Sequence, residues 1–393
     1  ALLREEKLSR TPAQKKMASV YVTHLRKERG DSKAQALPAG ASRAGPKLGR
    51  DGIVRVDIKG DITDQLIVLI NDSGGLVVSA APKYRIMTAE LPIDALEAIA
   101  ARDEVRSIMP VAKGITQKSS VSEGDVAHSA PSARSFYGAT GAGVKVGVIS
   151  DSVDYLAEVQ ATGDLPFVDV LSNISGSGEG TAMLEIVHDL APDADLLFAT
   201  AGNAGPAGMA NAIQALTQAG ADIIVDDIFW LGESPFQDDV VAQAAEDAIS
   251  AGVKYFTSAG NYGNLNDTTA SVYEGDYLPS SFGGIGEYSD IHQFPGSSTS
   301  NVALSDGFVF LFWSDALGQA SNDYDLLVYD ASGENLMDWS RNVQDGDDDP
   351  FEVVQVLAGE QIVVARYSGV PRFFHLSLPA RNQPALTWAT GGF

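Results

Sequence analysis

Between residues 141 and 261 the sequence alternates short apolar runs with amphipathic stretches of helical length. The first run, 144–149, is rich in β-branched residues and lies between glycine and a polar Ser-Asp-Ser segment, which is typical of a buried strand. Further strands are predicted at 195–199, 222–225 and 254–257, and helices at about 180–190, 208–219 and 238–251. This alternation predicts an α/β fold with a doubly wound, mostly parallel sheet.

Polar residues stand where these predicted strands end. Asp151 follows the first strand, Asp226 and Asp227 follow the third, and Asn261 lies just past the fourth. In open α/β sheets, catalytic and ligand-binding groups collect beyond the carboxyl ends of strands. Glu179, between two glycines at a predicted helix start, is favoured there by the helix dipole. Each of these residues taken alone also fits a helix cap, a loop acid or a turn.

The regions on either side of the alternation differ in character. Residues 51–112 carry the β-α-β-β-α-β order of a ferredoxin-like unit. Residues 286–386 lose helical periodicity and show short β-rich runs between turns, which predicts a β-sandwich that follows the α/β sheet or is inserted into it. The remaining divisions are a solvated basic lead segment and linker at 1–50, a linker at 113–140, the α/β core at 141–285, and a candidate return to that core at 387–393.

The charge of the chain is unevenly distributed. The net charge is −25, yet residues 1–50 hold 12 basic and 4 acidic side chains, so the remainder holds 27−12 = 15 basic and 52−4 = 48 acidic ones. Such an acidic remainder repels nucleic acid and anionic membranes, and it suits a secreted protein or one from a salty or acidic medium. The sequence has no cysteine for a disulfide framework, and no apolar run long enough for a transmembrane helix.

No signal peptide is visible in the sequence. The chain begins with alanine and ends at Gly391-Gly392-Phe393 without a closing element. We therefore expect further sequence at both ends.

Three motifs, taken together, resemble those of the subtilisin-like serine peptidases (subtilases) and occur in the same order. GVKVGVISDSVD at 143–154 looks like the aspartate motif, 179–194 looks like the His-Gly-Thr helix with its Ala-Pro-x-Ala turn, and 258–261 looks like the oxyanion-hole motif. The resemblance covers roughly residues 125–265. It implies a secreted endopeptidase that hydrolyses peptide or protein substrates by acyl transfer. It also implies that 51–112 is a propeptide that assists folding and acts as an intramolecular inhibitor.

The site implied by this resemblance departs from the family pattern at the histidine position, which holds Glu179. The resemblance implies Asp151, Glu179 and Asn261 as catalytic residues, with the two carboxylates sharing a proton as the base. A coupled pair of this kind raises one pKa, which predicts activity shifted to acid pH. The sedolisins, a related group, also use a glutamate, but the aspartate that they carry four residues later is Met183 here.

The second departure concerns the nucleophile. The family's serine follows a Gly-Thr pair, and the only Gly-Thr in this sequence is the one beside Glu179. We therefore expect the serine beyond Phe393 and expect the 393-residue chain alone to be inactive. The alternative is a non-catalytic relative that binds peptides or a partner through the same cleft.

Two further sets of residues are candidates for binding. In the subtilase family the strand that ends at Asp226 and Asp227 lines the substrate cleft and binds peptide by strand addition. In the β-rich region Asp323, Asp325 and Glu352 offer the hard oxygen ligands that Ca²⁺ prefers, with solvated turn acids as the alternative. The glycine-rich run 138–143 raises a nucleotide-binding protein as a third class, but it precedes its strand, whereas the dinucleotide fingerprint follows one.

Overall fold

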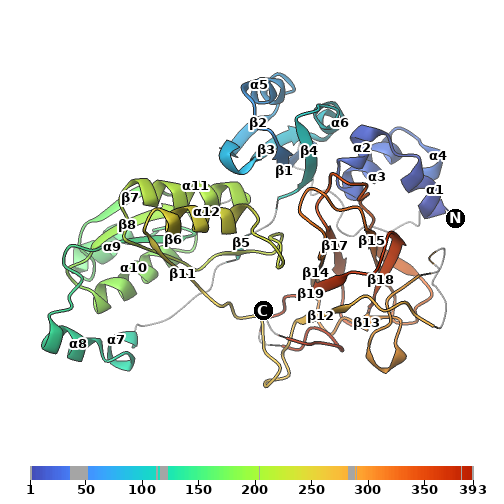
Figure 1. The fold of residues 1–393 in the computed structure, drawn as a ribbon. Coiled ribbons are helices and arrows are strands. Elements are labelled where there is room, and N and C mark those ends of the chain that lie inside the picture. Colours follow the sequence, from blue (N-terminus) through green and yellow to red (C-terminus); the bar gives the residue numbers. More distant parts are fainter. Residues whose placement is uncertain are drawn as a thin grey trace.

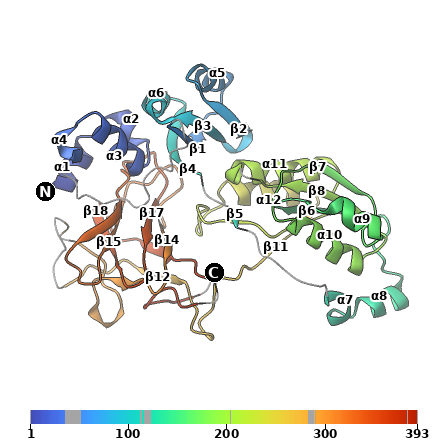
Figure 2. The ribbon, with the colours of Figure 1, turned by 180° about the vertical axis from the view of Figure 1, so that it is seen from behind.

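The computed structural model describes residues 2–35, 52–111, 114–115, 123–202, 204–281, 288, 290–381 and 383–391. These residues form a mixed α/β protein with one parallel sheet and several antiparallel sheets. In Figures 1 and 2 the parallel sheet lies at one end, two antiparallel sheets lie at the other, and a smaller antiparallel sheet lies beside both. Within the described residues no helix is both long and apolar enough to cross a membrane.

The smaller sheet belongs to residues 52–111, the four-stranded unit. Its strand order is β2-β3-β1-β4 and all neighbours are antiparallel. Its elements are β1 (Ile53–Gly60), α5 (Asp64–Asp72), β2 (Leu76–Ala81), η1 (Pro82–Tyr84), β3 (Ile86–Pro92), η2 (Ile93–Ala95), α6 (Leu96–Ala100) and β4 (Val105–Pro110). Thr63 caps α5 by accepting the Leu66 N–H at 3.1 Å. The chain order is thus β-α-β-β-α-β, as the sequence pattern predicts.

Residues 2–35, the lead segment, are not a solvated tail, so this prediction is wrong. They form α1 (Leu2–Leu8), α2 (Pro12–Lys15), α3 (Ser19–Glu28) and α4 (Ser32–Gln35). Met17, Tyr21, Val22 and Leu25 are buried in one core with the four-stranded unit. The Ala18 N–H donates to the Ile108 carbonyl at 3.0 Å, which fixes the segment along the outer edge of β4.

Residues 123–261 form the parallel-sheet unit. The strand order of its sheet is β11-β9-β6-β8-β7. Its strands are β6 (Lys145–Ser150), β7 (Val168–Ser172), β8 (Asp195–Thr200), β9 (Ile223–Asp226) and β11 (Lys254–Thr257). Its main helices are α9 (Leu156–Thr162), α10 (Glu179–Leu190), α11 (Gly205–Gln218) and α12 (Val240–Ser250). Because α11 and α12 share a core with one face of the sheet and α10 with the other, the doubly wound parallel sheet is confirmed.

Two short helices, α7 (Gly124–Ala127) and α8 (Ala130–Tyr137), lie in the region predicted as a linker. The described part of that region is therefore structured.

Two antiparallel sheets make up the C-terminal sheets, residues 272–391. One has the order β12-β19-β14-β17 and the other β13-β18-β15-β16. Their strands are β12 (Val272–Asp276), β13 (Asn301–Val302), β14 (Gly307–Trp313), β15 (Asp323–Tyr329), β16 (Leu336–Ser340), β17 (Phe351–Val356), β18 (Gln361–Ser368) and β19 (Phe373–Ser377), with a 3₁₀ turn η3 (Pro295–Ser297). Side chains of both sheets, among them Trp313 and Leu326, fill one shared apolar core.

The predicted limits of this region need correction at both ends. Val272–Asp276 falls within the predicted α/β core, 141–285, but it pairs with β19 as an edge strand. The predicted return of residues 387–393 to that core is not seen in the described residues. The Gly391 N–H donates to the Val272 carbonyl at 3.2 Å and the Trp388 N–H to Asn301 at 3.0 Å, so this stretch stays with the C-terminal sheets.

The four-stranded unit sits on α11 of the parallel-sheet unit. The Asn211 side chain donates to the Ala80 carbonyl at 3.2 Å, and the Thr88 hydroxyl donates to the Ala204 carbonyl at 2.8 Å. Beyond β4 the chain forms β5 (Gly114–Ile115), which pairs antiparallel with β10 (Phe229–Trp230) of the parallel-sheet unit. An extended piece of the chain therefore lies along the segment that follows β9.

Candidate active site

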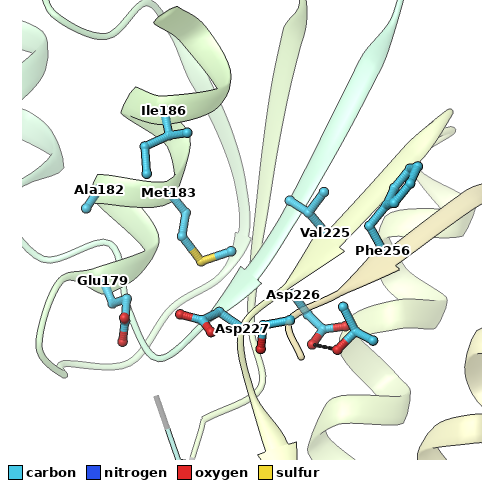
Figure 3. Close-up of a pocket in the computed structure, with 10 residues that line it drawn as sticks. Glu179, Ala182, Met183, Ile186, Val225, Asp226, Asp227 and Phe256 are labelled. Carbon is cyan, nitrogen blue, oxygen red and sulfur yellow. Dashed lines mark hydrogen bonds between the residues drawn. The ribbon is translucent and has the colours of Figure 1, made fainter. Parts of the chain in front are cut away.

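A pocket of about 330 Å³ lies where β9 and β11 end beside α10 (Figure 3). Its lining residues are Glu179, Ala182, Met183, Ile186, Val225, Asp226, Asp227, Phe256, Thr257 and Ser258. Figure 3 shows Glu179 on α10 at one side of the pocket and the two aspartates at the end of β9 at the other, with the Asp226 carboxylate turned toward Thr257. The structure thus brings three of the predicted acids, Glu179, Asp226 and Asp227, together around one cavity.

Asp151 lies next to this pocket and is not among its lining residues. Its carboxylate accepts the backbone N–H of Glu179 at 3.2 Å and the backbone N–H of Ser177. Backbone N–H groups at a helix start have no partner within the helix, so an acid there anchors the helix. Asp151 therefore positions the first turn of α10, which carries Glu179.

The position of Glu179 depends on the glycines on both sides of it. Its side chain is buried, with 6% of the residue exposed. Gly178 has a φ of +80°, a left-handed conformation that favours glycine. A Cβ on Gly180 would lie 2.4 Å from the Phe198 ring and 2.6 Å from the Ser152 carbonyl oxygen. The Gly-Glu-Gly sequence thus lets α10 approach the sheet closely enough to place Glu179 at the pocket.

Asp226 is a buried acid of the pocket whose pKa departs from its ordinary value. It is buried and accepts a hydrogen bond from the Thr257 hydroxyl at 2.8 Å. Burial raises the pKa of Asp226 to about 6, despite that hydrogen bond. A carboxyl group of this pKa can accept and release a proton in weak acid, which is the property that general acid–base chemistry requires.

Asn261 is exposed and is not among the lining residues, although Ser258 of the same motif is. The chain leaves β11 at Thr257, and two residues, Ala259 and Gly260, separate the lining residue Ser258 from Asn261. The predicted oxyanion donor therefore lies beyond the rim of this pocket.

Several lining residues were not predicted, but the sequence carries a signal for some. Ala182, Met183 and Ile186 follow Glu179 at spacings of three, four and seven residues, which places them on one helix face. Thr257 and Ser258 stand at the end of a strand, as Asp226 does. The position of Phe256 in the pocket follows from the open outer edge of β11 and has no such signal.

The acids predicted to hold Ca²⁺ lie far from this pocket, in the C-terminal sheets. The ammonium of Lys7 lies 2.8 Å from Asp323 and 2.7 Å from Asp325, and Glu352 accepts the backbone N–H of Asn342 at 2.7 Å. A divalent cation does not fit between Asp323 and Asp325 while Lys7 is there.

A different group of acids has oxygens close enough for a metal ion. Among the described residues, Asp345, Asp347 and Asp348 have carboxylate oxygens within 4.8 Å of one another. These acids lie in a loop between β16 and β17, and two of them are exposed. Clustered exposed acids of this kind are common in proteins without a metal ion, so we assign no metal to this group.

No protein-family model and no curated protein matches the sequence. Among solved structures, the epidermin leader peptide processing serine protease EpiP of Staphylococcus aureus is similar, with 14% identity and a TM-score of 0.37 over 55% of this chain and 62% of that one. Fervidolysin of Fervidobacterium pennivorans, a keratinolytic enzyme related to subtilisin, is also similar. Its identity to this chain is 17% and its TM-score is 0.37, over 53% of this chain and 40% of that one. The CspB protease of Clostridium perfringens has 11% identity and a TM-score of 0.41, over 66% of this chain and 68% of that one.

The chain therefore spans less than two thirds of the length of the first two of these proteins. Likenesses of this degree carry no argument about activity.

Proposed function

We propose that this chain is part of a secreted, subtilisin-like serine endopeptidase, in which the parallel-sheet unit binds an extended peptide beside the acidic pocket. The observation that carries the proposal is the antiparallel pairing of β5 with β10. β10 begins two residues after Asp227, so the chain itself lays an extended strand next to the acids of the site. Strand addition of this kind binds a peptide through its backbone and leaves side-chain pockets to select it.

In the proposed mechanism Glu179 is the general base and Asp151 positions the helix that carries it. Asp226 and Asp227 face Glu179 across the pocket and shape the binding of the substrate. Burial raises the pKa of Asp226 to about 6, so the charge of the pocket changes in weak acid, which is the range in which we expect activity to vary. Asn261 donates to the oxyanion once substrate draws its loop toward the pocket.

The nucleophilic serine is proposed to come from a segment beyond residue 393. The edge of the sheet beside the pocket supports this. β11 is the outermost strand in the described sheet, and 58% of Phe256 on it is exposed. An exposed aromatic side chain on an unpaired edge is a surface on which a further segment can pack.

The four-stranded unit is proposed to be an intramolecular inhibitor of this site. It packs on α11, and β5 follows it directly toward the cleft. In this arrangement the chain's own strand occupies the edge that a substrate would use.

A second candidate function is peptide binding without catalysis. The hydroxyl groups that line the pocket in the described residues are those of Thr257 and Ser258, and Thr257 is bonded to Asp226. Together with glutamate in place of histidine, this favours a binding protein if no serine segment exists.

The test uses the polypeptide extended past Phe393 and unfolded casein as substrate, between about pH 4 and pH 8. We expect hydrolysis that is faster in acid and is lost in Glu179→Ala. Glu185→Ala is the matched control, because Glu185 lies on the same helix outside the pocket. Undiminished hydrolysis in Glu179→Ala transfers the base role elsewhere. Casein binding without hydrolysis by the native protein supports the second candidate.

A further inference from the structure

Lys7 of the lead segment enters a closed set of acids on the C-terminal sheets. Its ammonium contacts Asp323 at 2.8 Å and Asp325 at 2.7 Å, and all three side chains are at most 4% exposed. The Tyr367 ring lies 4.5 Å from the ammonium, close enough for a cation–π contact. The site is therefore built for a cation with several donors on one small group.

The oxygens around Lys7 have further partners within the protein. The second oxygen of Asp325 accepts the Tyr288 hydroxyl. Glu352, fully buried nearby, accepts hydrogen bonds from the Asn342 N–H at 2.7 Å and from Ser340. Calcium requires six to eight oxygen ligands, and these oxygens are already engaged. The arrangement thus suits a primary ammonium better than a divalent cation.

Burial opposes the charged form of Lys7. The neighbouring Asp323 and Asp325 outweigh that effect, so the pKa of Lys7 is raised above its ordinary value. Lys7 is therefore charged in the folded protein.

A second buried charge cluster continues the same contact. Glu6 accepts from Arg10 at 3.1 Å, from Arg26 at 3.2 Å and from Arg341 of the C-terminal sheets at 3.2 Å. Arg10 also donates to the Arg341 carbonyl at 3.0 Å. The adjoining part of the lead segment bonds to the four-stranded unit, where Gln14 donates to Glu97 at 2.6 Å. Figure 1 shows the helices α1 to α4 beside that unit and next to the strands β15 and β18.

We propose that Asp323, Asp325 and Glu352 form a closed site for a primary ammonium group, that its ligand is Lys7, and that this contact fastens the lead segment and the four-stranded unit to the C-terminal sheets. If the four-stranded unit is an inhibitor, a point that rests on the function proposed above, extraction of Lys7 limits how fast that unit leaves. The contact itself is independent of any peptidase activity.

The test compares Lys7→Met with Lys15→Met in the full chain by hydrogen exchange. Lys15 is the matched control, because it lies on the same segment as Lys7 and also pairs with an acid of the C-terminal sheets. In that pair, with Asp345, both side chains are exposed. Removing one partner of a buried ion pair leaves the other charges buried alone, so exchange in α1 and α3 should accelerate on the order of 100-fold in Lys7→Met. Little change is expected in Lys15→Met.

A triple variant keeps the test decisive if Lys7→Met does not fold. Lys7→Met combined with Asp323→Asn and Asp325→Asn removes the stranded charges, so it should fold and regain much of the lost protection. A triple variant no better than Lys7→Met overturns the proposal, as does a Lys7→Met variant that exchanges like Lys15→Met. Millimolar CaCl₂ is the probe for the metal alternative. Protection of the native chain by CaCl₂, lost in Asp325→Asn, would also overturn it.

Discussion

Asp226 offers a prediction whose size can be worked out from its surroundings. Burial raises its pKa from 3.8 to about 6 in the folded protein. One pKa unit corresponds to about 1.36 kcal/mol, so ionising this buried group costs roughly 3 kcal/mol of local stability. Because the folded pKa lies above the unfolded one, the stabilising effect of the proton is complete below about pH 4 and is lost as the pH rises through about 6.

The Asp226→Asn variant removes this ionisation while it keeps an oxygen that can accept from Thr257. The native protein loses stability as the pH rises, whereas the variant does not. The free energy of opening of β9 and β11 in the variant, minus that in the native protein, should therefore grow by up to about 3 kcal/mol between pH 4 and pH 8. Hydrogen exchange of the amides in these strands measures this, with native and variant compared at each pH. Amides of β19 serve as the internal control. A difference between native and variant that stays constant with pH, or grows toward acid, would refute the reasoning.

Two further substitutions test how the site is held. Lys59 joins the units, with its ammonium 2.9 Å from Asp239 and 3.0 Å from Asp349, so Lys59→Met should lower the free energy of unfolding by about 2–4 kcal/mol in urea titration. Lys83→Met, which breaks a solvent-exposed pair with Asp247, should have a much smaller effect, and equal effects of the two substitutions would contradict the bridging role of Lys59. Gly180→Ala should destabilise the parallel-sheet unit by about 1–3 kcal/mol, because its Cβ would lie 2.4 Å from Phe198. An unchanged melting temperature in circular dichroism would contradict the close packing of α10.

The parts of the fold that follow from the sequence are those in which local pattern and burial agree. β6 is buried along most of its length and reads as an apolar run, and the glycines around Glu179 mark the start of α10. The strand β7 is not predicted, because four of its five residues are exposed and the short alternation Val168-Asp169-Val170 breaks at Leu171. The preceding helix α9 contains no buried residue, so its sequence does not predict a helix either.

The lead segment could not be predicted because its partners lie far away in sequence. Lys7 is separated from Asp323 by 316 positions, and without that acid a basic, charged helix favours solvent. The sequence-based calcium prediction could not take this contact into account, because the acids themselves give no sign that a lysine of the chain lies among them.

The candidate site was predictable in composition but not in arrangement. Strand ends placed Asp226 and Asp227 at the same edge as Glu179, as expected for parallel strands. The sequence could not show that Asp151 contacts the backbone of Glu179, or that Asn261 lies outside the pocket. Both depend on the path of loops, which periodicity does not define.

The most direct test of the account is whether the polypeptide extended past Phe393 cuts its own chain. We predict a new N-terminus within residues 113–135, found by N-terminal sequencing of the native protein and missing in Glu179→Ala. This window contains β5, the strand that lies beside the acidic pocket. A cut at the same place in Glu179→Ala, or a first cut outside the window, would contradict the claim that this pocket acts on the strand paired with β10.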